Sequence, residues 1–136
     1  MLSSRLPKAE ETARIISRGL DLPLQLRDGL EEHHRLKEDY IAEEGAFRDV
    51  LADFFRRPEE TVFGQESAAE ALERFAGAIK NLMGETEDDE LVVSHGTVIS
   101  LLLAQGSNGS PMDLWSSLKS PDHIAVGWPD LRRATV

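Results

Sequence analysis

An apolar run at residues 91–93 leads through Ser94 into His95 and Gly96, and a second apolar run begins at Thr97. The β-branched residues of the first run favour a strand, and the second run is long enough for a helix. A strand that turns directly into a helix is typical of α/β proteins, and the first N–H groups of such a helix bind phosphate and other anions. We therefore expect an α/β protein with an anion site at this junction.

Hydrophobic periodicity and capping residues predict alternating helices and strands along the rest of the chain. We expect helices at 7–19, 36–57, 67–83, 97–105 and 111–118, and strands at 1–4, 22–26, 91–94 and 124–128. The helix at 36–57 is either interrupted around Gly45 or begins there. Ser67 and Glu70 form a capping box, which makes the helix after them the best marked. The alternation predicts a three-layer α/β sandwich with a mostly parallel sheet. A length of 136 residues suits a single domain spanning residues 1–136.

The composition is acidic and narrows the choice of partners. Acidic residues outnumber basic ones by 25 to 15, and the net charge is −10. Nucleic acids and anionic membranes repel such a protein, so we expect neither as a partner. The absence of cysteine excludes disulfides, thiolate metal sites and a cysteine nucleophile. No apolar run approaches the roughly 20 residues that cross a bilayer, and no secretory signal occurs, so we expect a soluble cytoplasmic protein.

Two clusters of potential metal ligands are interpreted as solvated loops. His33 and His34 follow Glu31 and Glu32, but neighbouring side chains on one element point in different directions and do not converge on one ion. The acidic connector at residues 85–90 is interpreted in the same way. We therefore expect no metal and no other cofactor.

Four short segments together resemble the motifs of one protein family. They are 3–13 (SSRLPKAEETA), 30–34 (LEEHH), 64–67 (GQES) and 93–96 (VSHG), in the family's order and at plausible spacing. This family is the histidine phosphatase superfamily, and the resemblance implies its phosphoglycerate mutase-like fold over nearly the whole chain. It also implies the family's reaction, in which a histidine attacks a phosphomonoester and the phosphohistidine then transfers its phosphoryl group to water or back to the substrate.

The resemblance assigns roles to four residues. His95 is similar to the family's second histidine, which donates a hydrogen bond to phosphate, and Glu32 to the acid that protonates the leaving oxygen. We therefore expect Glu32 and His95 to be catalytic, and Lys8, His95 and Gly96 to bind phosphate. Lys8 stands where the family has arginine. Lysine keeps the charge but loses the bidentate fork, so phosphate binding is expected to be looser.

Three of these residues also have a purely structural interpretation. His95 could cap the helix that follows it, and Glu32 could be a surface carboxylate. Lys8 could be a solvated side chain, although a cation in the first turn of a helix is mildly unfavourable. Only their arrangement in space distinguishes these interpretations from the functional ones.

The sequence departs from the family at its start. The family opens with a strand that ends in Arg-His-Gly and supplies the nucleophile, and no such segment occurs here. His33, His34 and His123 do not stand at a strand end followed by glycine. We therefore expect an N-terminally truncated, incomplete domain that lacks its first strand and is inactive in this form. The missing strand would lie centrally, so we also expect a homodimer through the exposed sheet.

Two functions follow from these expectations. The first is a histidine phosphatase-like protein that binds phosphate or a phosphomonoester. The alternative is a non-catalytic, dimeric phosphatase-like domain that serves in interaction or anion binding.

Overall fold

Three short parallel strands and five helices make up the computed structural model, which describes residues 1–36, 39–106 and 108–134. In chain order the elements are β1 (Leu2–Ser3), α1 (Pro7–Leu20), β2 (Gln25–Leu26), α2 (Glu44–Arg56), α3 (Ala68–Met83), β3 (Val92–Val93), α4 (Gly96–Ala104) and α5 (Pro111–Ser117). The alternation of strands and helices confirms the predicted α/β class.

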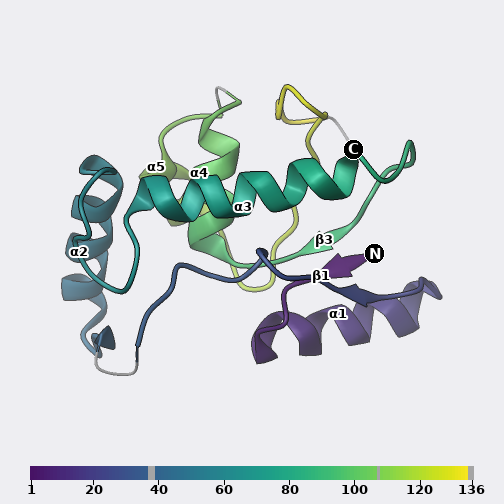
Figure 1. Cartoon of the computed structure of the whole chain (residues 1–136). Helices are drawn as coiled ribbons and strands as arrows, with labels where there is room; N and C mark the ends of the chain where they lie inside the picture. The colour runs from purple at the N-terminus through teal and green to yellow at the C-terminus, as the bar shows by residue number, and fades with distance from the viewer. Residues whose placement is uncertain (37–38, 107, 135–136) are drawn as a thin grey trace.

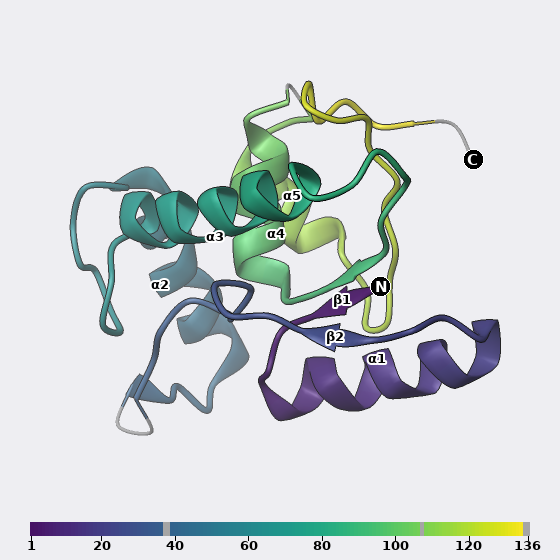
Figure 2. The same cartoon turned by 45° about the vertical axis from the view of Figure 1, so that its right-hand side comes forward.

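The strands form one sheet in the order β2-β1-β3, with both neighbours parallel to β1. Leu2 is paired with Gln25 on one side and with Val92 on the other. Helix α1 covers one face of the sheet, and α3, α4 and α5 lie on the opposite side (Figure 1). The turned view in Figure 2 shows the same arrangement, with α1 beneath β1 and β2. The molecule is therefore a three-layer sandwich, as predicted.

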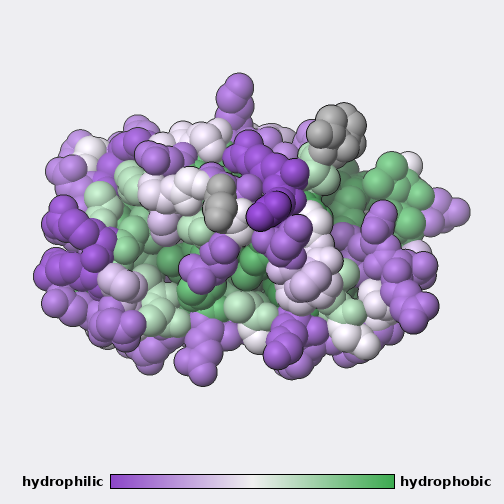
Figure 3. All heavy atoms as spheres, turned by 90° about the horizontal axis from the view of Figure 1, so that it is seen from above, coloured by the Kyte–Doolittle hydropathy of each residue, from purple (hydrophilic) through white to green (hydrophobic). Residues whose placement is uncertain are grey.

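The hydrophobic core lies among α2, α3 and α4 and reaches Leu2 of β1. Its fully buried members include Leu30 in the loop after β2, Leu51 and Phe54 of α2, and Val98 of α4. Burying a side chain of this size stabilises the fold by about 1.5–3 kcal/mol. Seen from above, hydrophilic residues cover much of the surface, and hydrophobic ones are visible between them near the middle (Figure 3).

The capping box at the start of α3 is present as predicted. Ser67 Oγ accepts the N–H of Glu70 at 3.1 Å, and the Glu70 carboxylate accepts the N–H of Ser67 at 3.0 Å. These bonds satisfy donors that the first helical turn leaves free. The start of α3 also fixes the preceding loop, which leads to the candidate functional site.

Of the two possibilities for the helical region predicted at 36–57, the structure shows a helix that begins near Gly45, because α2 starts at Glu44. The Glu43 carboxylate accepts the N–H groups of Gly45 and Ala46 and so caps the helix there. Further upstream, the Asp39 carboxylate accepts the N–H of Leu36, which is a turn and not a helical bond. Residues 37 and 38 of that prediction lie outside the described residues.

The strand predicted at 124–128 is wrong. Only a single antiparallel bridge between Val126 and Arg133 occurs in this segment. Gly127 N–H donates to the carbonyl of Arg132, and Leu131 N–H donates to the carbonyl of Gly127, so the chain turns back on itself. The strand predicted at 22–26 is reduced to Gln25–Leu26, and Pro23 has no N–H to donate to a sheet.

Strand β3 lies at one edge of the sheet within the described part of the chain. Its residues Val92 and Val93 are only half-buried. The expectation that the domain lacks a central strand stays a prediction. Among the described residues, no helix combines the length and the apolar character that crossing a membrane requires.

Candidate functional site

His95 stands at the junction of β3 and α4. Its backbone is extended, and the helix begins at the next residue, Gly96. His95 Nε2 lies 2.9 Å from the hydroxyl oxygen of Ser4, and that oxygen also accepts the N–H of Leu6 at 3.1 Å. The junction after β3 is thereby linked to the loop between β1 and α1. His95 does not cap α4 with its side chain.

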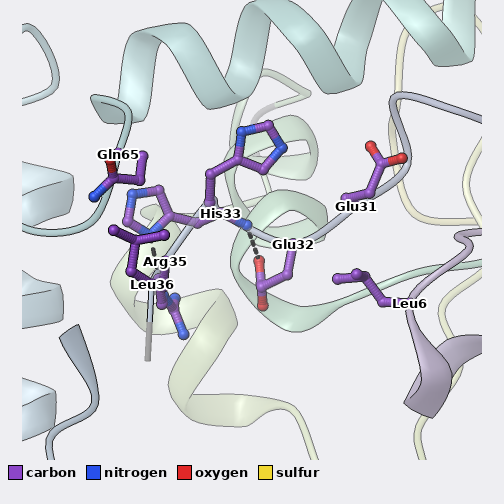
Figure 4. Close-up of a pocket in the computed structure, with 8 residues that line it drawn as sticks. Leu6, Glu31, Glu32, His33, Arg35, Leu36 and Gln65 are labelled. Carbon is purple, nitrogen blue, oxygen red and sulfur yellow. Dashed lines mark hydrogen bonds between the residues drawn. The ribbon is translucent and has the colours of Figure 1, made fainter. Parts of the chain in front are cut away.

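Glu32 lies directly at the N-terminus of α4. Its carboxylate accepts the N–H of Thr97 at 3.1 Å and that of Val98 at 3.2 Å. The same carboxylate accepts the N–H of its neighbour His33 at 2.9 Å (Figure 4). The helix dipole favours a negative group in this position. Within the described residues, the N–H of Gly96 has no such acceptor.

Charges from two segments, the start of α1 and the loop at residues 31–35, act on His95. Burial lowers the pKa of His95, the negative charges of Glu32 and Glu31 oppose this effect, and the positive charges of Lys8 and Arg35 add to it. Lys8 lies in the first turn of α1 and is exposed. The positive charge of Lys8 acts on His95, although Lys8 makes no ion pair among the described residues. The structure therefore brings Glu32 and His95 to the start of α4 at Gly96, with the charge of Lys8 near enough to act on His95.

Arg74 of α3 holds the loop that carries Glu32. Its guanidinium donates to the carbonyls of Gly29, Glu31 and Glu32 at 2.9–3.2 Å. It also donates to the Glu66 carboxylate at 2.7 Å. Burial alone would raise the pKa of Glu66, but the hydrogen bonds from Arg74 and from the backbone of His34 outweigh burial and lower it. Glu66 belongs to the GQES segment, so the resemblance pointed to this residue without indicating its partner.

His33 corrects the expectation of a solvated loop at residues 31–34. Its side chain is buried and packs against the rings of Phe54 and Phe63, with centroids 4.4 and 4.8 Å away. His33 Nδ1 accepts from Arg35 Nε at 3.0 Å, so its Nε2 carries the proton and donates to the carbonyl of Glu66 at 2.9 Å. His34 is exposed, as expected. No cluster of three potential metal ligands occurs within the described residues.

Arg35 is a site residue that the sequence analysis missed. It donates to His33 Nδ1 and, through Nη2, to the Thr97 hydroxyl at 3.1 Å. Burial lowers the pKa of Arg35, and the charges of Glu32 and Asp39 oppose this effect. In the sequence Arg35 is one charged residue among several in a polar stretch, and only its position after Glu32 could have drawn attention to it.

An open cavity of about 600 Å³ lies beside these residues. Its lining includes Leu6, Glu31, Glu32, Arg35 and Gln65 (Figure 4). The cavity therefore exposes both negative and positive groups next to the N-terminus of α4. Such a mixture suits a ligand that has anionic oxygens and a proton to exchange.

The free energy of unfolding is expected to fall as the pH is lowered from 7.5 to 5.5. A histidine in the unfolded chain takes up a proton near pH 6.5. The folded state lowers the pKa values of His33 and His95, so these two side chains stay neutral to a lower pH. The unfolded state then binds more protons, which favours unfolding by up to about 1.4 kcal/mol per pH unit for each histidine. Urea unfolding at several pH values measures this slope. His33→Gln should reduce the slope, and a flat profile in the wild type would contradict the argument.

Comparisons with known proteins address the family and the fold of the chain. The model of the histidine phosphatase superfamily, branch 1, matches residues 1–127. Among solved structures, the alpha-ribazole phosphatase from Shigella flexneri is similar, with a TM-score of 0.56 and 22% sequence identity. The match covers 85% of this chain and 59% of that one, so the chain spans less than two thirds of that phosphatase. A comparison with curated proteins finds no match. At this identity the structural likeness shows the fold alone.

Proposed function

The chain belongs to the histidine phosphatase superfamily, and from this premise we propose that it binds phosphate or a phosphomonoester at the N-terminus of α4. One observation carries the proposal: the Glu32 carboxylate already lies on the N–H groups of Thr97 and Val98, beside His95. An anionic group is thus held at the helix start, where the helix dipole and the remaining free N–H of Gly96 favour phosphate.

Four residues would bind the phosphoryl group or donate a proton at this site. His95 and the free N–H of Gly96 would donate hydrogen bonds to phosphoryl oxygens, and Lys8 would supply positive charge from α1. Glu32 would act as the proton donor to a leaving oxygen, which needs a carboxylic acid within hydrogen-bond reach. Lys8 makes a looser contact than arginine would, because its ammonium cannot bind two oxygens in one plane.

We propose that these 136 residues bind the ligand without turnover. The family's reaction needs a nucleophilic histidine, and none of the other three histidines is suited to this role. His33 is buried with both ring nitrogens engaged, and His34 is exposed with its ring 3.7 Å from the Glu66 carboxylate. His123 is exposed beside a separate small cavity in the C-terminal segment.

A phosphate titration followed by NMR tests the site. Inorganic phosphate at millimolar concentration is expected to shift the ring signals of His95 and the amide signals of Gly96 and Thr97. His95→Ala should weaken phosphate binding at least about tenfold, because a hydrogen bond to a charged group contributes about 1.5–3 kcal/mol.

His123→Ala is the matched control for the titration and should bind phosphate like the wild type. Unchanged His95 and Gly96 signals at millimolar phosphate would refute the binding proposal. Hydrolysis of an aryl phosphate above background would refute the absence of turnover.

A second candidate function is a non-catalytic, dimeric interaction domain. It is favoured by the position of β3 at the sheet edge, with Val92 and Val93 only half-buried. The same titration separates the two candidates, because a domain that serves only in interaction needs no response of His95 to phosphate.

A further inference from the structure

The imidazole of His33 uses both of its ring nitrogens to hold polar groups in place. Nε2 donates to the main-chain carbonyl of Glu66 at 2.9 Å, so it ties the loop after β2 to the loop before α3. Nδ1 accepts from Arg35 Nε at 3.0 Å. The ring is buried against Phe54 and Phe63. Water therefore cannot replace either hydrogen bond while the ring stays in place.

The bond from Arg35 to His33 exists only while the imidazole is neutral. An arginine Nε always carries a hydrogen and can only donate, so the bond needs the lone pair of an unprotonated Nδ1. A protonated imidazole carries hydrogens on both nitrogens. Two N–H groups of like charge would then face each other across 3.0 Å, without an acceptor between them. The contact with Arg35 must therefore break when His33 takes up a proton.

The surroundings of His33 keep its ring neutral near pH 7. Burial lowers the pKa of His33, and the positive charge of Arg35 adds to this effect. The main-chain bond to Glu66 and the negative charges of Glu66 and Glu32 oppose it. Helix α2 packs against the ring through Phe54. Proton uptake by His33 is therefore expected only in acidic solution.

The two carboxylates that favour the proton already have donors elsewhere. Glu32 accepts N–H groups at the start of α4, and Glu66 accepts from Arg74 and from the N–H of His34. Within the described part of the chain, no carboxylate lies within 4 Å of the ring nitrogens of His33. A new proton on Nδ1 thus has no acceptor nearby unless Arg35 moves away.

Arg35 connects His33 to the first turn of α4. Its Nη2 donates to Thr97 Oγ1 at 3.1 Å, and its guanidinium carbon lies 5.2 Å from the ring centre of Phe47 and 5.0 Å from that of Phe63. Arg35 also lines the cavity (Figure 4). Loss of the bond to His33 therefore removes one of the contacts that fix the cavity wall.

We propose that His33 is a pH-sensitive latch: when its ring takes up a proton, Arg35 loses its fixed position and the cavity wall between the loop after β2 and the first turn of α4 opens. The latch joins segments that are far apart in the sequence, and it acts while the rest of the fold stays intact. It does not require the proposed phosphate binding, because it depends only on contacts within the chain.

NMR of the wild-type protein without ligand tests the latch between pH 7.5 and about 4.5. The ring Cε1–H signal of His33 reports its protonation, and solvent exchange of the Arg35 Nε–H reports the bond between them. Exchange at Arg35, relative to that at the exposed Arg48, is expected to rise at least about tenfold with the same midpoint as the His33 ring, because a charge-assisted hydrogen bond is lost.

Three variants assign the change to His33. His33→Gln cannot take up the proton, so the rise in Arg35 exchange should disappear. His34→Gln is the matched control, because His34 is the exposed neighbour and its loss should leave the rise unchanged. In Arg35→Gln, His33 should take up its proton at a higher pH, because coupling between two events is reciprocal.

Two results would overturn the latch. One is proton uptake by His33 while the Arg35 Nε–H stays protected. The other is cooperative unfolding in acid, seen by circular dichroism, before the His33 ring titrates. Should His33→Gln not fold, the midpoints in the wild type and the other two variants still decide. The phosphate titration at neutral pH tests the proposed function separately, so either can fail without the other.

Discussion

Arg74→Met is expected to lower the free energy of unfolding by about 3 kcal/mol, which is the order of loss when one partner of a buried ion pair is removed. The Arg74 side chain is 19% exposed and that of Glu66 is 9% exposed. Without the guanidinium, the Glu66 charge and the carbonyls of Gly29, Glu31 and Glu32 lose their donor. Urea unfolding of the variant and the wild type measures the difference.

A double variant makes the Arg74 prediction specific. Glu66→Gln in the Arg74→Met background removes the unpaired charge and should recover part of the lost stability, so the two changes should not be additive. Arg57→Met is the matched surface control, because Arg57 pairs with Glu60 and Asp53 in an exposed position. Its effect should stay below about 1 kcal/mol. An Arg74 effect no larger than this control would contradict the buried role.

The Arg74 variant also bears on the phosphate site. Arg74 fixes the backbone of the loop that carries Glu32, whereas it does not line the cavity. We expect the amides of Thr97 and Val98, which Glu32 contacts, to shift in the variant even without phosphate. This readout separates a loss of loop position from a general loss of stability.

Gly64→Ala is expected to cost about 3 kcal/mol, from backbone strain and from a clash that overpacks the core. Gly64 has φ +73°, and a Cβ there would lie 2.5 Å from His33 Cε1 and 2.6 Å from the carbonyl oxygen of His34. The His34 carbonyl cannot move freely, because it accepts the N–H of Gln65 at 2.7 Å. The imidazole of His33 must therefore shift away from Arg35 and from the carbonyl of Glu66.

Two further glycine variants separate the causes of the Gly64 effect. Gly109 also has a positive φ, +102°, but a Cβ there meets nothing within 4 Å, so Gly109→Ala should cost only the strain, about 1–2 kcal/mol. Gly77 lies in α3 with open space, and Gly77→Ala should stabilise by roughly 0.5–1 kcal/mol. Equal losses at Gly64 and Gly109 would show that the contact with His33 does not matter.

The elements predicted correctly share one property, which is that neighbours in the chain specify them. The capping box joins Ser67 to Glu70, three residues away, and the turn from β3 into α4 depends on a few adjacent residues. The start of the helix predicted within 36–57 could not be fixed from the spacing of apolar residues alone, because the carboxylates of Asp39 and Glu43 cap turns there. Periodicity does not detect such side-chain bonds to the backbone.

The candidate site was predicted only in part. His95, Glu32 and Lys8 could be named because motif resemblance marked them, and the structure brings Glu32 and His95 to the start of α4. His33 and Arg35 could not be recognised, because the burial of His33 depends on Phe54 and Phe63 from other elements. The bond from Arg35 to Thr97 spans 62 residues of sequence. No local pattern carries that information.

The sequence by itself determined the α/β class, the start of α3, the turn at His95 and the membership of residues in family motifs. These depend on interactions within a few residues and on the order of short segments. Only the tertiary structure decided that the Glu32 carboxylate lies on the N–H groups of α4 and that Arg35 faces the cavity between two phenylalanine rings. The physical reason is that packing of distant elements sets which polar groups meet, and with it their burial and charge.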